Sequence, residues 1–536
     1  MVYRVTDIKV EIDRDPADLS GLIAKKLTVS PGEIRGYRTV KKALDARDKG
    51  RLCFVYTVDV ELTLKGVKKL ARRHSSGVTL REPEPDLELI PGNIPLESRP
   101  VIIGAGPAGI FAALALARYG YRPLIFERGQ DVDTRAASVD EFWLNRLLDP
   151  ESNVQFGEGG AGTFSDGKLT TRINDPRVRG VLEDFVRAGA PEEILFLHKP
   201  HIGTDRLRTV VKNLRLSLQD MGGEVIFGSR VTELLLESGR VTGVVINGQR
   251  QVPAKAVILA IGHSARDTYE MLEKSGCLVE QKAFSIGVRV EHPQGVIDSA
   301  QYGRYAGHPK LGAADYQLVY KNDEMERAAY TFCMCPGGSV VAAASEENTV
   351  VVNGMSDYAR DTGVANSAVV VSVNPDDYVN THPLAGVEYQ RKWERAAFRA
   401  GGSNYNAPAQ LAGDFLAGRA STSLDAAPWA SYRPGLEPGD IHECLPGYVT
   451  SMLEEAIGAF DRKLKGFALP EAVLTGVETR TSAPVRLVRD SNGESVGIGG
   501  LYPAGEGAGY AGGIVSAAVD GIKAAEALIC RYRKEE

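Results

Sequence analysis

The stretch Val101-Ile102-Ile103-Gly104-Ala105-Gly106-Pro107-Ala108-Gly109 decides the fold of this chain. A short apolar strand pattern leads into a Gly-x-Gly-x-x-Gly turn, and an Ala/Leu-rich helix pattern follows through Arg118. In such a unit Gly104 permits the tight turn, Gly106 lets the backbone approach a pyrophosphate, and Gly109 lets the helix pack on the strand. The helix N-terminus presents free N–H groups to the phosphates. The order predicts the first βαβ unit of a dinucleotide-binding α/β domain.

A second strand pattern, Pro123-Leu124-Ile125-Phe126, ends in Glu127-Arg128. An acid about 20 residues beyond the glycines accepts hydrogen bonds from ribose hydroxyls in this type of fold. The glycine turn alone is a weak signal. Because strand, turn, helix and acid coincide, they predict a dinucleotide site that includes Glu127 and Arg128.

Three distant segments favour FAD over NAD. Residues 225–246 read as a β-meander that contains Val231, and Ala256–Gly262 then reads as a buried strand ending in glycine. Residues 500–528 form a glycine-rich turn followed by a helix pattern. That turn includes Gly505, Glu506, Gly512, Gly513 and Ile514.

The third segment, Phe156–Lys168, is dense in glycine and includes Gly159 and Gly160. Its backbone N–H groups can lie against a pyrophosphate or a flavin ring, and Lys168 can supply a cation. An ordinary surface loop is the alternative interpretation of this segment alone.

The middle of the chain leaves the dinucleotide domain and returns to it. Strand patterns occur at Phe284–Val290, Ser339–Ala343 and Val350–Val352, and helix patterns at Val387–Phe398 and Tyr448–Leu464. We therefore expect an inserted, mixed α+β cap domain. The predicted divisions are an N-terminal domain at 1–85, a linker at 86–98, the first part of the dinucleotide domain at 99–265, the cap at 266–488, and the second part of the dinucleotide domain at 489–536.

The N-terminal domain reads as small, basic and α+β. Strand patterns lie at Val5–Glu11 and Leu52–Val58, and helix patterns at Leu19–Leu27, Val40–Ala46 and Val67–Arg73. Residues 1–82 carry 18 Lys and Arg against 11 Asp and Glu, whereas the whole chain has a net charge of −6. This domain could bind RNA or an acidic protein partner, and a solvated basic face is the plainer interpretation. Residues 82–99 are rich in proline and should be extended.

The overall composition is that of a globular protein. The 536 residues are 43% hydrophobic and 25% charged, and the sequence contains no run of about 18 apolar residues. The six cysteines are scattered, and neither a disulfide framework nor a zinc motif is evident. We therefore expect a cytoplasmic protein with no membrane span and no metal site.

Taken together, these motifs resemble the uncharacterised FAD-dependent dehydrogenases, also called NAD(FAD)-utilising dehydrogenases, of the glutathione-reductase-like flavoprotein superfamily. The resemblance runs nearly end to end. Its most specific pieces are Phe156–Lys168, Thr331–Gly338, Val477–Arg486 and the glycine-rich turn at 500–514. It implies a glutathione-reductase-like FAD-binding Rossmann domain with an inserted cap domain.

The resemblance also implies roles for individual residues. The backbone at Val231 lies by the adenine, and Ala260-Ile261-Gly262 stands for the ATG motif of the superfamily, with Ile in place of Thr. Glu506 takes the place of an acid that binds the ribityl chain. The Gly512-Gly513 turn aims its helix at the flavin N1–C2=O edge, where a positive dipole end stabilises reduced flavin. The predicted FAD-contacting set also includes Ala108, in the first turn of the leading helix.

Cys333 and Cys335 could be a thiol pair that exchanges electrons with the flavin. Redox dithiols normally use a CxxC spacing, so two structural cysteines are the alternative. Arg480 could clamp a substrate carboxylate or phosphate, or form an interdomain salt bridge. His442 could act as a proton donor, although a single histidine is more often structural.

The sequence thus predicts an FAD-dependent oxidoreductase that transfers a hydride between flavin N5 and an unidentified small-molecule substrate under the cap. No second strand–Gly-x-Gly-x-x-Gly–helix unit occurs in the inserted middle of the chain, so NAD(P)H, if it is the electron donor, has no Rossmann domain of its own. Two alternatives remain open. One is a flavin-dependent monooxygenase, and the other is a non-catalytic flavoprotein whose N-terminal domain binds RNA or a protein partner.

Overall fold

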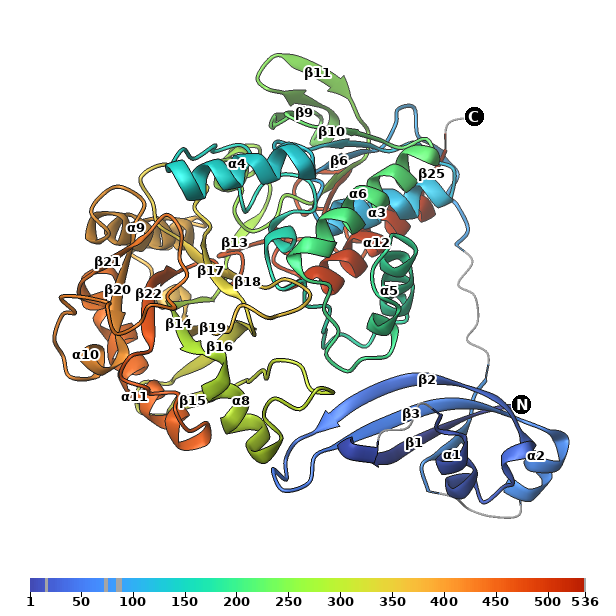
Figure 1. Cartoon of the computed structure of the whole chain (residues 1–536). Coiled ribbons are helices and arrows are strands. Elements are labelled where there is room, and N and C mark those ends of the chain that lie inside the picture. The colour runs from blue at the N-terminus through green and yellow to red at the C-terminus, as the bar shows by residue number, and fades with distance from the viewer. Residues whose placement is uncertain (15–17, 72–75, 83–88, 535–536) are drawn as a thin grey trace.

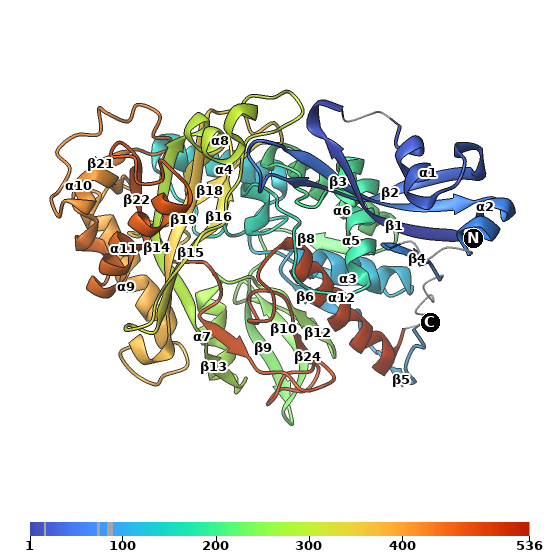
Figure 2. The same cartoon turned by 90° about the horizontal axis from the view of Figure 1, so that it is seen from below.

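The computed structural model describes residues 1–14, 18–71, 76–82 and 89–534. Three parts are visible in Figure 1: an N-terminal module, a layer built on a parallel sheet, and a large body built on a second sheet. Figure 2 shows the same three parts side by side from below. Over these ranges no helix is both long and apolar enough to cross a bilayer.

The parallel sheet is assembled from three distant regions of the chain. Its strand order is β24-β12-β6-β7-β8, and every neighbouring pair is parallel. The strands are β6 (Val101–Ile103), β7 (Leu124–Phe126), β8 (Glu224–Ile226), β12 (Val257–Leu259) and β24 (Leu501–Pro503). The strand, turn, helix order predicted at residues 101–118 is confirmed.

Four helices share one hydrophobic core with this sheet: α3 (Pro107–Arg118), α5 (Arg177–Arg187), α6 (Thr204–Asp220) and α12 (Ile514–Arg531). Glycine sets how closely two of them pack. A Cβ at Gly521 of α12 would lie 2.0 Å from the carbonyl oxygen of Ala108 on α3. The C-terminal helix therefore lies directly against the helix that follows the Gly-x-Gly-x-x-Gly turn.

Smaller elements surround this layer. The predicted meander forms an antiparallel sheet in the order β11-β10-β9, which comprises β9 (Val231–Glu237), β10 (Arg240–Ile246) and β11 (Arg250–Pro253). Helix α7 (Arg266–Lys274) contacts β9, and α4 (Val132–Asn145) packs against α6. In the predicted linker, residues 83–88 lie outside the described ranges. Strand β5 (Ile94–Pro95) beyond them pairs with β25 (Tyr532–Arg533).

The large body is built on a seven-stranded sheet of order β15-β16-β19-β14-β22-β20-β21. All its neighbours are antiparallel except β20 and β21. The strands are β14 (Phe284–Pro293), β15 (Val319–Asn322), β16 (Arg327–Cys335), β19 (Val364–Val373), β20 (Ala407–Leu411), β21 (Leu436–Pro438) and β22 (Val473–Glu478). The predicted strand at 284–290 lies in its centre.

Four helices and a two-stranded sheet pack against this sheet. They are α8 (Gln294–Tyr302), α9 (Ala385–Ala400), α10 (Ala412–Leu416), α11 (Gly447–Lys463), and β17 (Ser339–Ala342) paired with β18 (Val352–Met355). Strands β13 (Val279–Gln281) and β23 (Val485–Leu487) form a separate pair whose apolar side chains share a core with the β9–β11 sheet. Strand β14 is buried along nearly its whole length, and the polar residues that alternate with its apolar ones, such as Arg289 and Glu291, are buried with them.

The N-terminal module has a four-stranded antiparallel sheet of order β2-β3-β1-β4. Its elements are β1 (Val2–Glu11), α1 (Ser20–Leu27), β2 (Ile34–Asp45), β3 (Cys53–Leu62), α2 (Leu64–Leu70) and β4 (Val78–Leu80). The predicted helix at Val40–Ala46 is wrong, because this segment pairs with β3 as part of β2. Long-range pairing overrides the local helical spacing there. The helix predicted at Val67–Arg73 lies earlier, in α2, and residues 72–75 are outside the described ranges.

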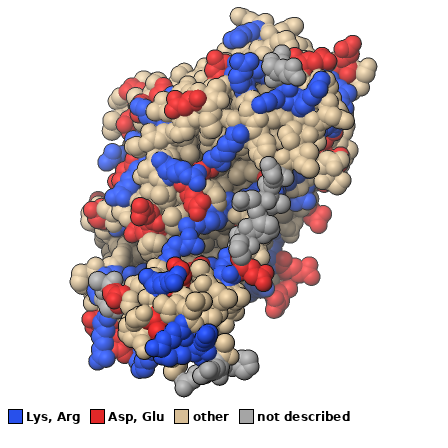
Figure 3. All heavy atoms as spheres, turned by 90° about the vertical axis from the view of Figure 1, so that its right-hand side faces the viewer, with Lys and Arg blue, Asp and Glu red and all other residues tan. Residues whose placement is uncertain are grey.

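The N-terminal module packs on the rest of the chain through β2. The Lys42 N–H donates to the Phe196 carbonyl at 2.7 Å, and the His198 N–H donates to the Lys42 carbonyl at 2.9 Å. On the face seen in Figure 3, basic and acidic side chains are interspersed, and basic ones gather at its lower end. The positive charge of the module is therefore partly neutralised by neighbouring acids, as in the pair of Arg4 with Asp59 at 2.8 Å.

Candidate FAD site and substrate cavity

One cavity of about 490 Å³ lies where the carboxyl ends of the parallel strands face the seven-stranded sheet. Its size falls in the range of small-molecule sites, roughly 300–1,000 Å³. Most residues predicted to contact FAD line it. They are Gly104, Gly106, Ala108, Glu127, Arg128, Gly160, Lys168, Val231, Gly262, Glu506, Gly512, Gly513 and Ile514.

Three other predicted glycines, Gly109, Gly159 and Gly505, lie behind the lining and serve packing. A Cβ at Gly109 would lie 1.9 Å from the Gly104 carbonyl oxygen. At Gly505 it would lie 2.8 Å from the Cβ of Ala108, and at Gly159 2.2 Å from the Thr163 hydroxyl. These positions are glycine because the protein itself leaves no room.

Gly106 is different, because nothing in the protein requires a glycine there. A Cβ would meet only the Cα of Gly160, at 3.8 Å, which is an ordinary contact. Its backbone is extended, with φ −75° and ψ −178°, which suits other residues. The missing side chain therefore leaves space for a ligand at the N-terminus of α3.

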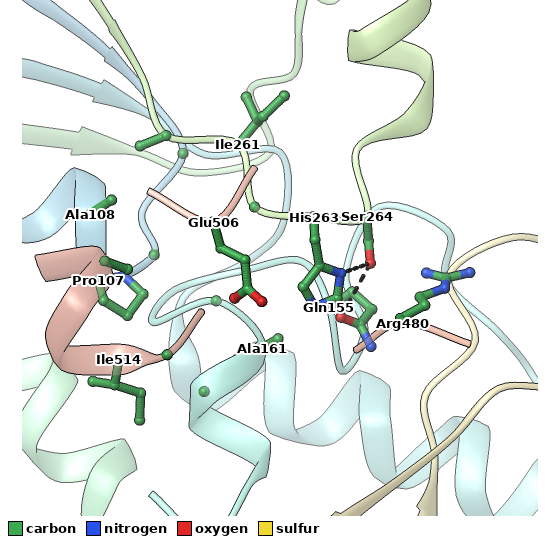
Figure 4. Close-up of a pocket in the computed structure, with 18 of the residues that line it drawn as sticks. Pro107, Ala108, Gln155, Ala161, Ile261, His263, Ser264, Arg480, Glu506 and Ile514 are labelled. Atoms are coloured by element: carbon green, nitrogen blue, oxygen red, sulfur yellow. Dashed lines mark hydrogen bonds between the residues drawn. The ribbon is translucent and has the colours of Figure 1, made fainter. Parts of the chain in front are cut away.

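Two helix N-termini open on the cavity, as Figure 4 shows for Pro107 of α3 and Ile514 of α12. Their first N–H groups have no partners within the helix, and their positive dipole ends favour negative charge. One site can therefore hold both the pyrophosphate and a reduced flavin ring, as the sequence predicts.

Glu127 lies at the end of β7 and is only 5% exposed. Its carboxylate accepts hydrogen bonds from the backbone N–H groups of Ala105 at 2.7 Å and of Gly129 and Gly157 at 2.9 Å each. These bonds tie the glycine turn to the 156–168 loop. Because each carboxylate oxygen has two lone pairs, Glu127 can still accept from a ribose hydroxyl.

Glu506 points into the middle of the cavity (Figure 4). No donor within the described ranges forms a hydrogen bond with its carboxylate. Burial raises its pKa to about 7, against the opposing attraction of Lys282. An acid without donors fits a ligand that brings hydroxyls to it, such as the ribityl chain.

Replacing Glu506 by Gln is expected to change how the stability of the apoprotein depends on pH. The folded-state pKa of about 7 exceeds the unfolded value of 4.5, so the stabilisation is complete below pH 4.5 and is lost as the pH rises through 7. Between pH 5 and 8 wild-type apoprotein should lose on the order of 2–3 kcal/mol more than Glu506→Gln. Urea unfolding measures this difference. The exposed Glu280→Gln is the control, and parallel curves for wild type and Glu506→Gln would contradict the assignment.

Gln155, His263 and Ser264 also line the cavity, and the sequence analysis missed them. His263 and Ser264 directly follow Gly262, just beyond the carboxyl end of β12. Ligands bind at this edge of an open α/β sheet, so their position was a usable signal. No comparable signal marks Gln155, which reaches the cavity only through folding of its loop.

Arg480 lines the cavity and also belongs to a buried ionic cluster. Its Nε and one terminal nitrogen each donate to Glu394 at 3.1 Å, and Arg266 donates to Glu394 at 2.7 and 2.9 Å. Glu394 is fully buried. Arg480 therefore forms a salt bridge within the predicted cap rather than between domains, and Glu394 orients the guanidinium at the cavity wall.

Cys333 lines the cavity, whereas Cys335 is fully buried behind it. A β-bulge between Phe332 and Cys335 interrupts the pairing of β16 with β19, and Cys333 has a φ of +42°, which is strained for a side chain. The Cys335 thiol, followed by the cations Lys168 and Arg289, lowers the pKa of Cys333. The two thiols are adjacent, and both are free.

His442 lies outside the lining of this cavity. Its two ring nitrogens contact Asp440 at 2.6 Å and Glu454 at 3.1 Å, and its ring stacks on Phe415. Because both ring nitrogens already have carboxylate partners, the role of His442 is structural. Glu478, by contrast, does line the cavity and is held by two hydrogen bonds from Arg289, at 2.7 and 3.1 Å.

Comparison with known proteins assigns most of the chain to flavoprotein models. Residues 98–280 match "Pyridine nucleotide-disulphide oxidoreductase", 283–481 match "FAD-dependent protein, C-terminal domain-like", and 2–61 match a domain of unknown function, DUF8436. A Clostridium beijerinckii protein described as uncharacterised is 50% identical over 533 residues, or 99% of each chain. The chain belongs to the same FAD-dependent oxidoreductase family. Its cofactor is FAD.

Other relatives of this FAD-dependent protein match over shorter lengths. Digeranylgeranylglycerophospholipid reductase of Haloferax volcanii is 32% identical over 31% of this chain and 35% of that protein. Protein FixC of Escherichia coli is 26% identical over 42% and 52%. The solved structure of CtdE in complex with FAD has a TM-score of 0.30 and 13% identity over 80% and 82% of the two chains. That score is too low to support any argument.

Proposed function

We propose that this protein is a glutathione-reductase-like flavoenzyme that transfers a hydride between FAD and a small-molecule substrate. One observation carries the proposal: a single cavity runs from the Gly-x-Gly-x-x-Gly turn to polar residues of the seven-stranded sheet. When bound, FAD supplies a centre that accepts or donates two electrons and a proton as a hydride at N5.

The chain's own residues divide the cavity into two ends. Gly106, Glu127 and the N-termini of α3 and α12 would hold the dinucleotide and the charge of the reduced ring. At the other end Lys168, Cys333 and Arg480 surround the remaining space. Since Glu394 and Ser345 take up three of the five N–H groups of Arg480, the others can orient a polar substrate.

The substrate itself, or NAD(P)H docked at the open end of the cavity, would supply the electrons. Over residues 266–488, the inserted part of the chain, no strand, Gly-x-Gly-x-x-Gly turn, helix unit occurs. A second dinucleotide would therefore bind without a Rossmann domain of its own.

The test is anaerobic bleaching of the bound flavin with NADH, NADPH and a panel of reduced metabolites. We expect purified protein to be yellow, to release FAD on denaturation, and to be bleached by one donor class. Protein that binds FAD but is bleached by none of them would contradict the hydride-transfer proposal. Rapid reoxidation with substrate-dependent oxygen consumption would instead indicate a monooxygenase.

The Cys333 site supports thiol–disulfide chemistry as a second candidate. The Cys333 thiolate would attack a substrate disulfide and release one thiol, and Cys335 would then form the Cys333–Cys335 disulfide and release the second. Two electrons and two protons from the reduced cofactor would restore both thiols. Bleached enzyme should then be reoxidised by a small disulfide. Cys333→Ser enzyme should still be bleached by the donor but should not be reoxidised by the disulfide. Equal reoxidation of wild type and variant would rule it out.

A further inference from the structure

Three polar side chains form a hydrogen-bonded chain on the wall of the FAD cavity (Figure 4). The Ser264 hydroxyl donates to Gln155 Oε1 at 3.3 Å, and Ser264 Oγ lies 2.9 Å from His263 Nδ1. At the far end, Gln155 Nε2 donates to the carbonyl of Ala343 at 3.3 Å. Nothing proposed above uses these residues.

The chain determines which ring nitrogen of His263 carries the proton. The Ala343 carbonyl can only accept, so it must face the amide nitrogen of Gln155, and Oε1 then faces Ser264. A hydroxyl has a single hydrogen, and that of Ser264 is used on Gln155. In this arrangement Ser264 Oγ accepts from His263 Nδ1–H, and the ring-nitrogen signals described below test that direction. A neutral imidazole has one N–H, so Nε2 is a bare lone pair.

The surroundings keep this imidazole neutral. Burial, followed by the guanidinium groups of Arg480 and of Arg266 on α7, lowers the pKa of His263 to about 3, and Glu394 on α9 opposes them. Over the described ranges no residue hydrogen-bonds to Nε2, and His263 lines the cavity. With so low a pKa it is a weak base, but it can accept a hydrogen bond at any ordinary pH.

We propose that His263 is a fixed hydrogen-bond acceptor of the FAD cavity and selects a ligand that carries an O–H or N–H donor, such as an alcohol or an amine. Gln155 and Ser264 are its positioning residues. A carbonyl or carboxylate oxygen at the same place would face another lone pair and would be disfavoured. The selection of a substrate rests on the proposed function, whereas the state of the imidazole does not.

Nuclear magnetic resonance of the holoprotein with ¹⁵N-labelled histidine rings tests the acceptor directly. His263→Leu identifies the signals. We expect the Nδ1–H form, unchanged between about pH 5 and 8, over which an ordinary histidine titrates. Ser264→Ala should give a mixture of the Nδ1–H and Nε2–H tautomers of His263, whereas Ser264→Thr should keep the Nδ1–H tautomer. An Nε2–H form, or titration near the ordinary value, would overturn the proposal.

Phenol and anisole test the selection, because anisole has the same ring and oxygen but carries a methyl group in place of the O–H hydrogen. Each is titrated into the oxidised holoprotein while the flavin absorbance is followed. We expect phenol to bind roughly 2- to 12-fold more tightly, as one hydrogen bond allows, and His263→Leu to remove the preference. Equal binding, or no binding of either, would overturn the selection. Protein that retains FAD but is bleached by no donor contradicts only the proposed function, since the ring signals remain readable.

Discussion

Gly106→Val is expected to abolish FAD binding while leaving the fold intact. The extended backbone at Gly106 accommodates valine, and its Cβ would meet nothing in the protein closer than 3.8 Å. The side chain would instead occupy the space between the glycine turn and Gly160, where the pyrophosphate is expected. We expect affinity for FAD to fall at least about 100-fold, equivalent to about 2.8 kcal/mol.

The measurements are flavin content after purification and thermal unfolding of the two apoproteins. Gly180→Val is the matched control, because a Cβ at Gly180 also meets nothing within 4 Å but the residue lies on α5, away from the cavity. Gly109→Ala provides the contrast and should fail to fold, since its Cβ would lie 1.9 Å from a carbonyl oxygen. Full flavin content in Gly106→Val would refute the placement of the cofactor.

Glu394→Gln should destabilise the protein strongly although it leaves the size of the core unaltered. Glu394 is fully buried and accepts from Arg266, Arg480 and the Thr479 hydroxyl. A neutral amide leaves the two buried guanidiniums without their shared counter-ion. Breaking a buried ion pair in this way costs about 3–5 kcal/mol, because the remaining charge stays desolvated.

Urea unfolding, followed by tryptophan fluorescence, measures this loss. Glu388→Gln is the control on the same helix: its partner is Arg391 at 2.6 Å, but its side chain is 62% exposed. We expect it to cost no more than about 1 kcal/mol, as surface pairs do. If both substitutions cost the same, the cluster around Glu394 does not hold Arg480 in place.

Local patterns in the sequence were enough to predict the cofactor site. The turn at residues 104–109, Glu127 at the end of the next strand, and Glu506 in the last glycine-rich segment all lie on one cavity. The turn and Glu127 depend on short spacings, because the turn, the helix and the strand end are set by residues within about 20 positions of one another. Glu506 was predicted from the resemblance of the glycine-rich turn at 500–514 to the flavin motif of the superfamily. The family comparisons then confirm FAD.

The N-terminal module shows where local patterns mislead. Residues 40–46 have helical spacing, yet 40–45 form the end of β2, because β2 pairs with β3 along most of its length. The same limit applies to His442. The sequence suggested it as a proton donor, but its ring pairs with Asp440 and Glu454 outside the cavity. Residue type and spacing do not state which distant residues become neighbours.

The sequence by itself therefore determined the βαβ unit at residues 101–127, because its strand, turn and helix follow from near neighbours in the chain, and the motifs it carries predicted FAD as the cofactor. Only the tertiary structure decided the other end of the cavity. There Glu394 orients Arg480 across 86 positions, and Gln155 orients Ser264 across 109. Such pairs depend on how two sheets pack, and no local spacing records that packing.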